Sequence, residues 1–178
     1  MKEAEIIWKS IKTLAQKKEY PKKSWLLNEG EVSKHLLFIE RGCIRSWFNN
    51  DGDDITFQFF FEGSFVSSFE SFRKNEPSLF NLETIEPSVL HLIHIDDLAN
   101  VEQDLSGLKD ALIEFLSTRL YHYQKLFLSR IKNSPQRRYE ELMKDNPGIF
   151  KRVPHHYIAS YLGITPVSLS RIRNKAER

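Results

Sequence analysis

The sequence predicts an α+β protein that consists of a small β-barrel or jelly roll, one long helix and a compact group of C-terminal helices. Three observations lead to this prediction. Residues 25–95 contain short apolar runs separated by turn signals, which is typical of closely spaced strands. Residues 106–131 keep apolar residues at helical spacing over many turns. Residues 155–173 place a glycine between two short amphipathic segments, as in a helix-turn-helix.

The first elements are predicted from local spacing and turn chemistry. Residues 4–16 have the pattern of a short amphipathic helix. The clearest hairpin joins residues 44–48 to residues 55–61 across Asp51-Gly52, a dipeptide that suits a tight turn. After the strands, Asp96 opens a short helix. The 178 residues leave room for a barrel and a small second domain.

The long helix is apolar on more than one side, and a helix of this kind is usually covered twice. Four of its residues follow the 4-3-4 spacing of a coiled-coil seam, namely Leu116, Leu120, Tyr123 and Phe127. One side of the helix can therefore pack on the barrel while the seam meets a second copy of the chain. The sequence thus predicts a homodimer. The alternative is that both sides are buried within one chain, which has little spare mass for this purpose.

The stretch at residues 155–173 is the most informative about function. Ile158 and Leu162 share one face of a first helix, because they are four residues apart. Leu169 and Ile172 share one face of a second helix. Both faces are therefore expected to pack into one core.

The residues between these two helices suit a tight turn. Ala159 is small enough for the helices to cross closely, and Gly163 can adopt the positive φ that ends the first helix. Thr165 is expected to cap the second helix, with Pro166 at its first position. In DNA-binding proteins of this type the second helix lies in the major groove.

The predicted contacts with double-stranded DNA come from the second helix and its surroundings. Ser168 and Arg171 lie opposite the apolar face and are expected to contact base edges, since an arginine can bind guanine with two hydrogen bonds. Three further cations are expected to contact phosphates. The predicted DNA-binding residues are Thr165, Ser168, Arg171, Arg173, Lys175 and Lys151.

Charge favours DNA binding over an ordinary helical hairpin, which is the structural alternative for this stretch. Residues 131–178 contain ten Lys and Arg against four Asp and Glu, a net charge of +6. Residues 1–130 contain sixteen against twenty, a net charge of −4. A basic segment attached to an acidic body is typical of a protein that contacts phosphates through that segment.

A barrel, a long helix and a basic helix-turn-helix together resemble the Crp/Fnr superfamily of bacterial transcription regulators. Residues 59–72 are similar to the phosphate-binding cassette of cyclic-nucleotide-binding domains, and residues 152–173 are similar to the helix-turn-helix of the subgroup with shortened C-termini. The resemblance implies an effector barrel with an N-terminal helix at residues 1–105, a dimerisation helix at 106–132 and a DNA-binding domain at 133–178.

The same resemblance implies a sequence-specific transcription regulator that responds to a small molecule, and it makes RNA polymerase a candidate partner. The sequence stops soon after the expected recognition helix, so we expect it to lack room for the β-hairpin wing that many relatives carry beyond that helix. We therefore expect DNA binding either to be weaker or to depend more on that helix and its flanks. The competing interpretation is a ligand-binding or interaction module whose DNA-reading domain is vestigial.

The cassette departs from the pattern of relatives that bind cyclic AMP. Ser67-Ser68-Phe69 stands where those relatives resemble Gly-Glu-Leu, and Ser78-Leu79 stands where an arginine and its hydroxyl neighbour would be. A cyclic phosphate needs a cation, so we do not expect cyclic AMP to bind. The pocket is expected either to take a different, less charged effector or to be filled by phenylalanines. The candidate pocket residues are Ser67, Ser68, Phe69, Ser78, Tyr121 and Tyr123.

Other classes of protein are disfavoured. His91 and His94 are an odd number of residues apart, so on a strand they point to opposite faces and do not form a metal pair. Cys43 is the only cysteine, which excludes a disulfide within one chain. The chain contains no nucleophile elbow, no glycine-rich phosphate loop and no apolar run near the ~20 residues of a membrane span. We expect a cytoplasmic protein without catalytic activity, metal or required cofactor.

Overall fold

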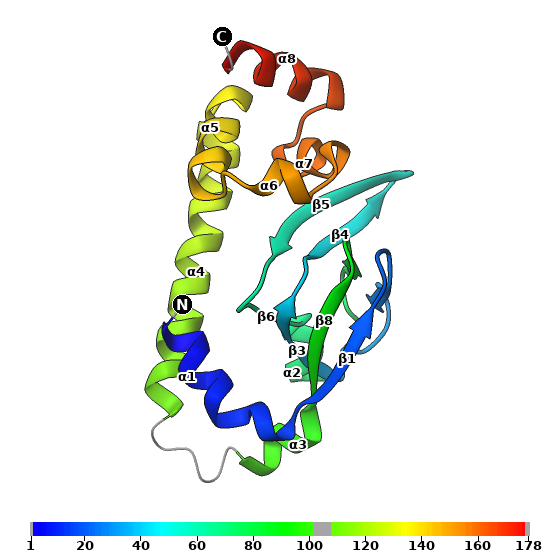
Figure 1. Ribbon diagram of the computed structural model, residues 1–178, viewed down its shortest axis with the longest axis vertical. Coiled ribbons are helices and arrows are strands. Elements are labelled where there is room, and N and C mark those ends of the chain that lie inside the picture. The colour runs from blue at the N-terminus through cyan, green and yellow to red at the C-terminus, as the bar shows by residue number, and fades with distance from the viewer. Residues whose placement is uncertain (1, 102–107, 177–178) are drawn as a thin grey trace. The chain divides into compact units, whose positions relative to one another are not determined.

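The computed structural model describes residues 2–101 and 108–176, and it confirms antiparallel sheets combined with helices (Figure 1). The helices are α1 (Lys2–Ile11), η1 (Lys12–Leu14), α2 (Phe69–Lys74), α3 (Ile95–Val101), α4 (Leu108–Lys132), α5 (Pro135–Asp145), α6 (Ile149–Arg152), α7 (His155–Leu162) and α8 (Pro166–Ala176). The strands are β1 (Gln16–Tyr20), β2 (Trp25–Leu27), β3 (His35–Arg41), β4 (Ile44–Asn50), β5 (Asp53–Phe60), β6 (Phe65–Val66), β7 (Asn81–Thr84) and β8 (Ser88–His94).

The chain divides into two compact units. The first comprises residues 1–48 and 59–119, and the second comprises residues 49–58 and 120–178. The boundary predicted between residues 105 and 106 lies outside the described residues, so the long helix is known here from Leu108 onward. Among the described helices, none combines the length and the apolar character that crossing a membrane requires.

Two four-stranded sheets form the β-structure, with strand orders β1-β8-β3-β6 and β2-β7-β4-β5. The pairs β1–β8, β3–β8 and β4–β7 are antiparallel. Apolar residues from both sheets form one core, as the predicted jelly roll requires. Its buried members are Leu27, Leu37, Ile39, Ile44, Phe60, Val66, Leu82 and Leu90.

The turn between β4 and β5 confirms the predicted hairpin. Asp51 has a φ of 51° and Gly52 has a φ of 98°. A two-residue turn with positive φ at both positions matches the right-handed twist of the strands that it joins, and aspartate and glycine tolerate this conformation better than other residues. The Gly52 N–H also donates a hydrogen bond to Asn49 Oδ1 at 3.1 Å.

The predicted helix at residues 4–16 was too long at its C-terminal end. The α-helix ends at Ile11, and Gln16–Tyr20 forms β1, which pairs with β8 at the edge of its sheet. Four of the five residues of β1 are exposed, so neither face of this strand needs apolar side chains. Its sequence therefore shows no alternation of apolar and polar residues. Charged side chains such as Lys17 are common on edge strands, where they discourage pairing with other chains.

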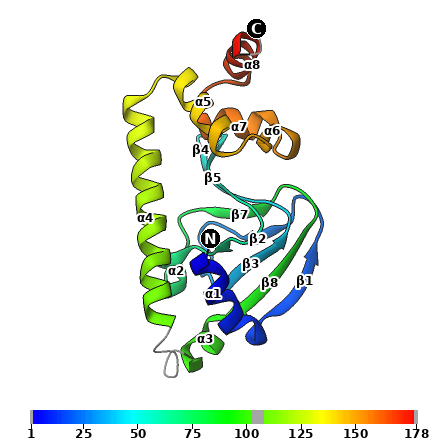
Figure 2. The ribbon, with the colours of Figure 1, turned by 60° about the vertical axis from the view of Figure 1, so that its left-hand side comes forward.

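Helix α1 lies over the sheet that contains β3 and β8 (Figure 2). Ile7 and Ile11 are buried there against Phe65 and Ile93, which accounts for the amphipathic pattern of α1. The first half of α4 joins this core through Phe115, whose ring lies 5.9 Å from that of Phe65 and nearly perpendicular to it.

The C-terminal helices of the second unit have a core of their own. Its buried residues are Tyr139, Ile149, Val153, Ile158, Ala159, Leu162 and Leu169. Helix α6 was not predicted from the sequence. It is a single turn that begins after Gly148, and it buries Ile149 with an exposed fraction of 1%.

Candidate nucleic-acid interface and effector pocket

Gly163 ends α7 as the sequence predicts. It adopts the left-handed conformation, with φ 65° and ψ 41°. Its N–H donates to the Ser160 carbonyl at 2.9 Å, and the N–H of Ile164 donates to the Ala159 carbonyl at 3.0 Å. These bonds satisfy two of the carbonyls that a helix leaves unpaired at its C-terminus. The chain can therefore turn directly into α8.

Thr165 caps α8, which confirms a second prediction. Its Oγ1 accepts a hydrogen bond from the Ser168 N–H at 3.2 Å and lies 3.0 Å from Ser168 Oγ. Pro166 occupies the first position of the helix. The cap satisfies one of the free N–H groups of the first turn and thereby determines where α8 begins.

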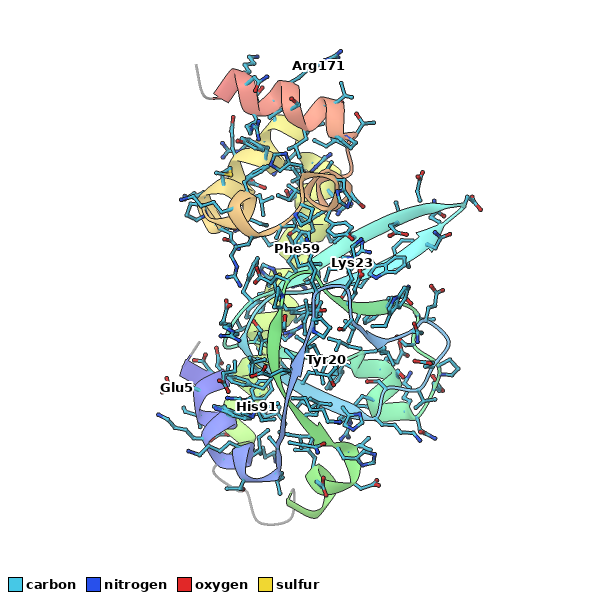
Figure 3. The ribbon with its side chains drawn as sticks, turned by 45° about the vertical axis from the view of Figure 1, so that its right-hand side comes forward. Glu5, Tyr20, Lys23, Phe59, His91 and Arg171 are labelled. Carbon is cyan, nitrogen blue, oxygen red and sulfur yellow. The ribbon has the colours of Figure 1, made fainter. Side chains whose placement is uncertain are left out.

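Helix α8 has a buried face and an exposed face. Leu169 is only 2% exposed and Ile172 is half-buried, so this side packs into the helical core. The opposite side carries the exposed residues Val167, Ser170, Arg171 and Asn174. These four residues lie at the i, i+3, i+4 and i+7 spacing of one helix face, which we call the outer row of α8. Figure 3 shows Arg171 extending away from the neighbouring helices.

The outer row agrees only in part with the predicted base contacts. Arg171 is exposed as expected, whereas Ser168 is half-buried and its hydroxyl lies against the cap residue Thr165. Sequence reasoning missed Val167, Ser170 and Asn174. Helical spacing from Arg171 would have identified all three of them.

The cations predicted to contact phosphates have different surroundings. Lys151 on α6 and Lys175 near the end of α8 are exposed. Arg173 is half-buried, and its Nη1 lies 3.4 Å from Nε2 of His155 on α7. The structure therefore leaves the two lysines more accessible than Arg173.

Two arginines satisfy carbonyls at the C-terminal end of α7. Arg138 Nε donates to the Leu162 carbonyl at 3.0 Å, and Arg130 donates to the Tyr161 carbonyl. Cations stabilise helix C-termini, where unpaired carbonyls concentrate negative partial charge. Burial lowers the pKa of Arg130, so this contact also has a desolvation cost. Part of the positive charge near this segment thus serves the packing of α7.

Ser160 joins α7 to the hairpin segment at residues 49–58, which belongs to the same unit. Its Oγ accepts a hydrogen bond from the Thr56 N–H at 2.9 Å and donates one to the Asp54 carbonyl at 2.8 Å. A single hydroxyl therefore satisfies both a donor and an acceptor of the β5 backbone. Sequence reasoning missed this contact because it links residues that lie more than a hundred positions apart.

The cassette brings Ser68 and Ser78 together. Both side chains are buried, and their Oγ atoms lie 2.9 Å apart. Ser78 Oγ also lies 2.7 Å from the Phe80 carbonyl oxygen, which can only accept. Ser78 therefore donates to Phe80, and Ser68 donates to Ser78. Ser68 and Ser78 stand where cyclic-AMP-binding relatives resemble an acid and an arginine. In this chain the two positions hold neutral hydroxyls that are hydrogen-bonded to each other.

The remaining candidate pocket residues are less buried. Ser67 is half-buried, and Phe69 is 54% exposed at the start of α2. Tyr121 and Tyr123 on α4 are 65% and 40% exposed. Within the first unit, the hydrogen bond between Ser68 and Ser78 is the contact that joins two of the candidate residues from separate segments of the described chain.

The charged residues of the cassette helix α2 face solvent. Arg73 and Lys74 are exposed, and Lys74 Nζ lies 2.6 Å from Glu70 Oε1. The hydrogen bond with Glu70 raises the pKa of Lys74, and the same bond lowers the pKa of Glu70. Neither cation of this helix points into the barrel core.

Two other cations of the first unit are buried or half-buried, and both have partners. Arg45 Nε lies 2.7 Å from Glu83 Oε2, and the side chains are 2% and 7% exposed. Arg119 on α4 donates to the Phe65 carbonyl at 3.1 Å and lies over the ring of Phe60 at 5.2 Å. Neither arginine stands out in the sequence, because their partners Glu83 and Phe65 come from other segments of the chain.

The predicted seam of α4 consists of exposed apolar residues. Leu116, Leu120, Tyr123 and Phe127 are 37%, 56%, 40% and 66% exposed. Contiguous apolar patches on a protein surface commonly mark interaction sites. All four side chains of the seam are therefore at least about a third exposed among the described residues.

Comparison with known proteins agrees with this architecture. Residues 17–104 match the sequence profile of the cyclic nucleotide-binding domain. The c-di-GMP responsive global regulator CLP from Xanthomonas campestris superposes with a TM-score of 0.76 and 18% identity, over 95% of this chain and 89% of that chain. FixK2 from Bradyrhizobium japonicum gives a TM-score of 0.75 and 17% identity over 92% and 84%.

A Crp/Fnr-family protein from Eubacterium rectale gives a TM-score of 0.70 and 18% identity, over 95% of this chain and 81% of that chain. A search of the curated proteins finds no match. Similarity to solved structures at this level of identity shows a shared fold. Residues 17–104 therefore match the cyclic nucleotide-binding domain family, and the chain shares its fold with these solved structures, one of which is described as a member of the Crp/Fnr family.

Proposed function

We propose that the protein is a sequence-specific DNA-binding transcription regulator in which α8 is the recognition helix of a helix-turn-helix. The outer row of α8 carries this proposal. It is exposed, it stands opposite the buried Leu169, and it has Arg171 at its centre. The fold shared with CLP, a global regulator, supports the same conclusion. The proposed function is one of binding and includes no catalytic step.

The geometry of α7 and α8 is suited to the major groove. A recognition helix contacts base edges through the residues of its N-terminal half, while neighbouring groups contact phosphates. Arg171 has the length and the planar pair of donors that a guanine requires. The exposed Lys151 lies on α6, and the exposed Lys175 lies near the end of α8. The described residues therefore offer both kinds of contact. RNA polymerase stays a predicted partner.

Arg171→Ala is expected to weaken operator binding by about 1–3 kcal/mol and to relax the sequence preference at one position of each half-site. The physical reason is the loss of two hydrogen bonds to one base. Fluorescence anisotropy at a fixed salt concentration, with an operator selected from random duplexes, measures the effect.

Lys175→Ala provides the contrast to Arg171→Ala. A lysine that contacts a phosphate contributes equally to all sequences, so its removal should lower the slope of log affinity against log salt by about one and leave the preference unchanged. If Arg171→Ala binds the selected operator as tightly as the parent protein, the assignment of the outer row as the base-reading face is wrong.

We further propose that the functional form is a homodimer held together by the seam of α4. The seam has coiled-coil spacing and is exposed along its length. A two-fold dimer carries two copies of α8. Helix-turn-helix dimers place their two recognition helices about 34 Å apart, which is one turn of DNA. Pairing with α4 of a second copy would therefore bury the apolar seam, and the resulting dimer would present two recognition helices to the DNA.

The effector pocket is proposed to be altered relative to domains that bind cyclic nucleotides. Ser68 and Ser78 satisfy each other, and Arg45 is neutralised by Glu83. Burying the charge of a cyclic phosphate without a free cation is costly. Buried phenylalanines such as Phe60 support the idea that the interior is largely filled by the chain itself.

Cyclic AMP is expected to bind weakly or not at all to the full chain, with no heat of binding at micromolar concentrations in titration calorimetry. The reason is the absence of a free cation beside the Ser68–Ser78 pair in the described cassette. Because CLP responds to cyclic di-GMP, this dinucleotide is the second ligand to titrate, and its two phosphates predict equally weak binding. A low-micromolar dissociation constant for either ligand would refute the altered pocket, and Arg119→Ala would then test which cation had been recruited.

The second candidate function is a ligand-binding or interaction module with a vestigial DNA-reading domain. Arg138 and Arg173 favour it, because both are half-buried and make contacts within the helical unit. This candidate predicts DNA binding without sequence preference. The operator selection described above separates the two functions, since only a true reader enriches one sequence.

A further inference from the structure

Val167 is an apolar side chain in a place where the surface is otherwise polar. It is 61% exposed. Among residues 133–175, whose exposure the structure describes, it is the one large apolar side chain that is more than about a third exposed. Its companions in the outer row of α8 are Ser170, Arg171 and Asn174. The apolar group therefore lies on the face that would meet DNA.

The local structure offers no folding reason for valine at this position. Val167 is in the first turn of α8, two residues after the cap Thr165. Valine is a weak helix former, and an exposed side chain contributes little to the core. Its branched side chain has essentially one rotamer in a helix, so the two methyl groups are held in a fixed direction. Such a group is preorganised for contact with an external surface.

The major groove presents one apolar feature, the C5-methyl group of thymine. We propose that Val167 contacts that methyl group and so specifies a T·A pair in each half-site. This proposal rests on the proposed function of α8 as a recognition helix. The outer row of α8 would then contact two bases in each half-site, a thymine through Val167 and a guanine through Arg171.

The spacing of the two side chains restricts where the thymine lies. Val167 and Arg171 are four residues apart on one face, which places their Cβ atoms about 5–6 Å apart. Successive bases rise by about 3.4 Å. The thymine should therefore lie within one or two base pairs of the guanine that Arg171 contacts.

The test replaces each thymine of the selected operator, one at a time, by deoxyuridine, which lacks only the methyl group. Anisotropy with the full chain should show a loss of about fourfold at one position per half-site, the value that corresponds to one buried methyl group. With Val167→Ala the parent operator should bind more weakly, and the deoxyuridine operator should bind no more weakly than the thymine operator. Val167→Thr retains one methyl group and should keep part of the uridine effect.

Matched controls keep the outcomes distinct. A uridine in the flanking DNA should have no effect, and Ser170→Ala should retain the full uridine penalty. If the protein selects an operator but no uridine changes its affinity, or if Val167→Ala keeps the penalty, the assignment of Val167 is overturned while DNA recognition by α8 stands. If no operator is selected at all, the proposed function fails, and the role of Val167 fails with it.

Discussion

Replacing Leu120 or Phe127 of α4 by glutamate is expected to produce monomers and to reduce operator binding by roughly 10²–10⁴-fold. Each substitution would place a charge in the proposed seam, where desolvation opposes association. A monomer carries one recognition helix, so it loses the gain in affinity that comes from linking two binding elements. Light scattering measures the oligomeric state, and anisotropy with the selected operator measures the affinity.

Leu128→Glu is the matched control for the seam. Leu128 is also an exposed apolar residue of α4, with an exposed fraction of 46%, but it follows the seam position Phe127 directly and lies off the 4-3-4 row. This variant should remain dimeric and bind the operator. A parent protein that is monomeric at micromolar concentration would contradict the dimer. Equal disruption by Leu128→Glu would contradict the choice of face.

Glu83→Ala is expected to lower the free energy of unfolding by about 3–5 kcal/mol, because it leaves the buried guanidinium of Arg45 without its carboxylate. Arg45 also stacks over the ring of Trp47, with its Cζ 4.5 Å from the ring centroid, so it cannot turn to solvent without losing that contact. Urea denaturation of the purified chain measures the effect.

Two further variants serve as controls for Glu83→Ala. The double substitution Arg45→Met with Glu83→Leu should recover most of the stability, since an apolar pair of similar volume can replace a buried ion pair. Glu70→Ala removes a carboxylate from an ion pair that is exposed to solvent and should leave stability nearly unchanged. A loss for Glu83→Ala as small as that for Glu70→Ala would mean that water reaches Arg45.

Elements governed by neighbouring residues were predictable from the sequence. The β4–β5 turn depends on the φ angles of Asp51 and Gly52, and the junction of α7 and α8 depends on Gly163 and Thr165. In these cases the backbone preferences and short side chains of a few consecutive residues decide the conformation. The apolar spacing of α8 similarly anticipated that Leu169 would be buried.

Strand β1 could not be predicted in this way. Its residues are exposed and charged, and they adopt an extended conformation because the edge of β8 supplies hydrogen-bond partners. The overestimated length of the first helix has the same origin, since the pairing begins at Gln16. Backbone pairing between segments as far apart in the sequence as Gln16 and Leu92 leaves no local pattern in the side chains.

The sequence by itself determined the order of barrel, long helix and basic helices, the turn at Gly163 and the candidate base contact at Arg171. Only the tertiary structure decided that Ser68 and Ser78 bond to each other and that Arg138 caps α7. Whether a polar side chain is free for a ligand or occupied within the chain depends on partners that arrive from distant segments. Local chemistry therefore predicts where elements begin and end, whereas the availability of each charged group is set by folding.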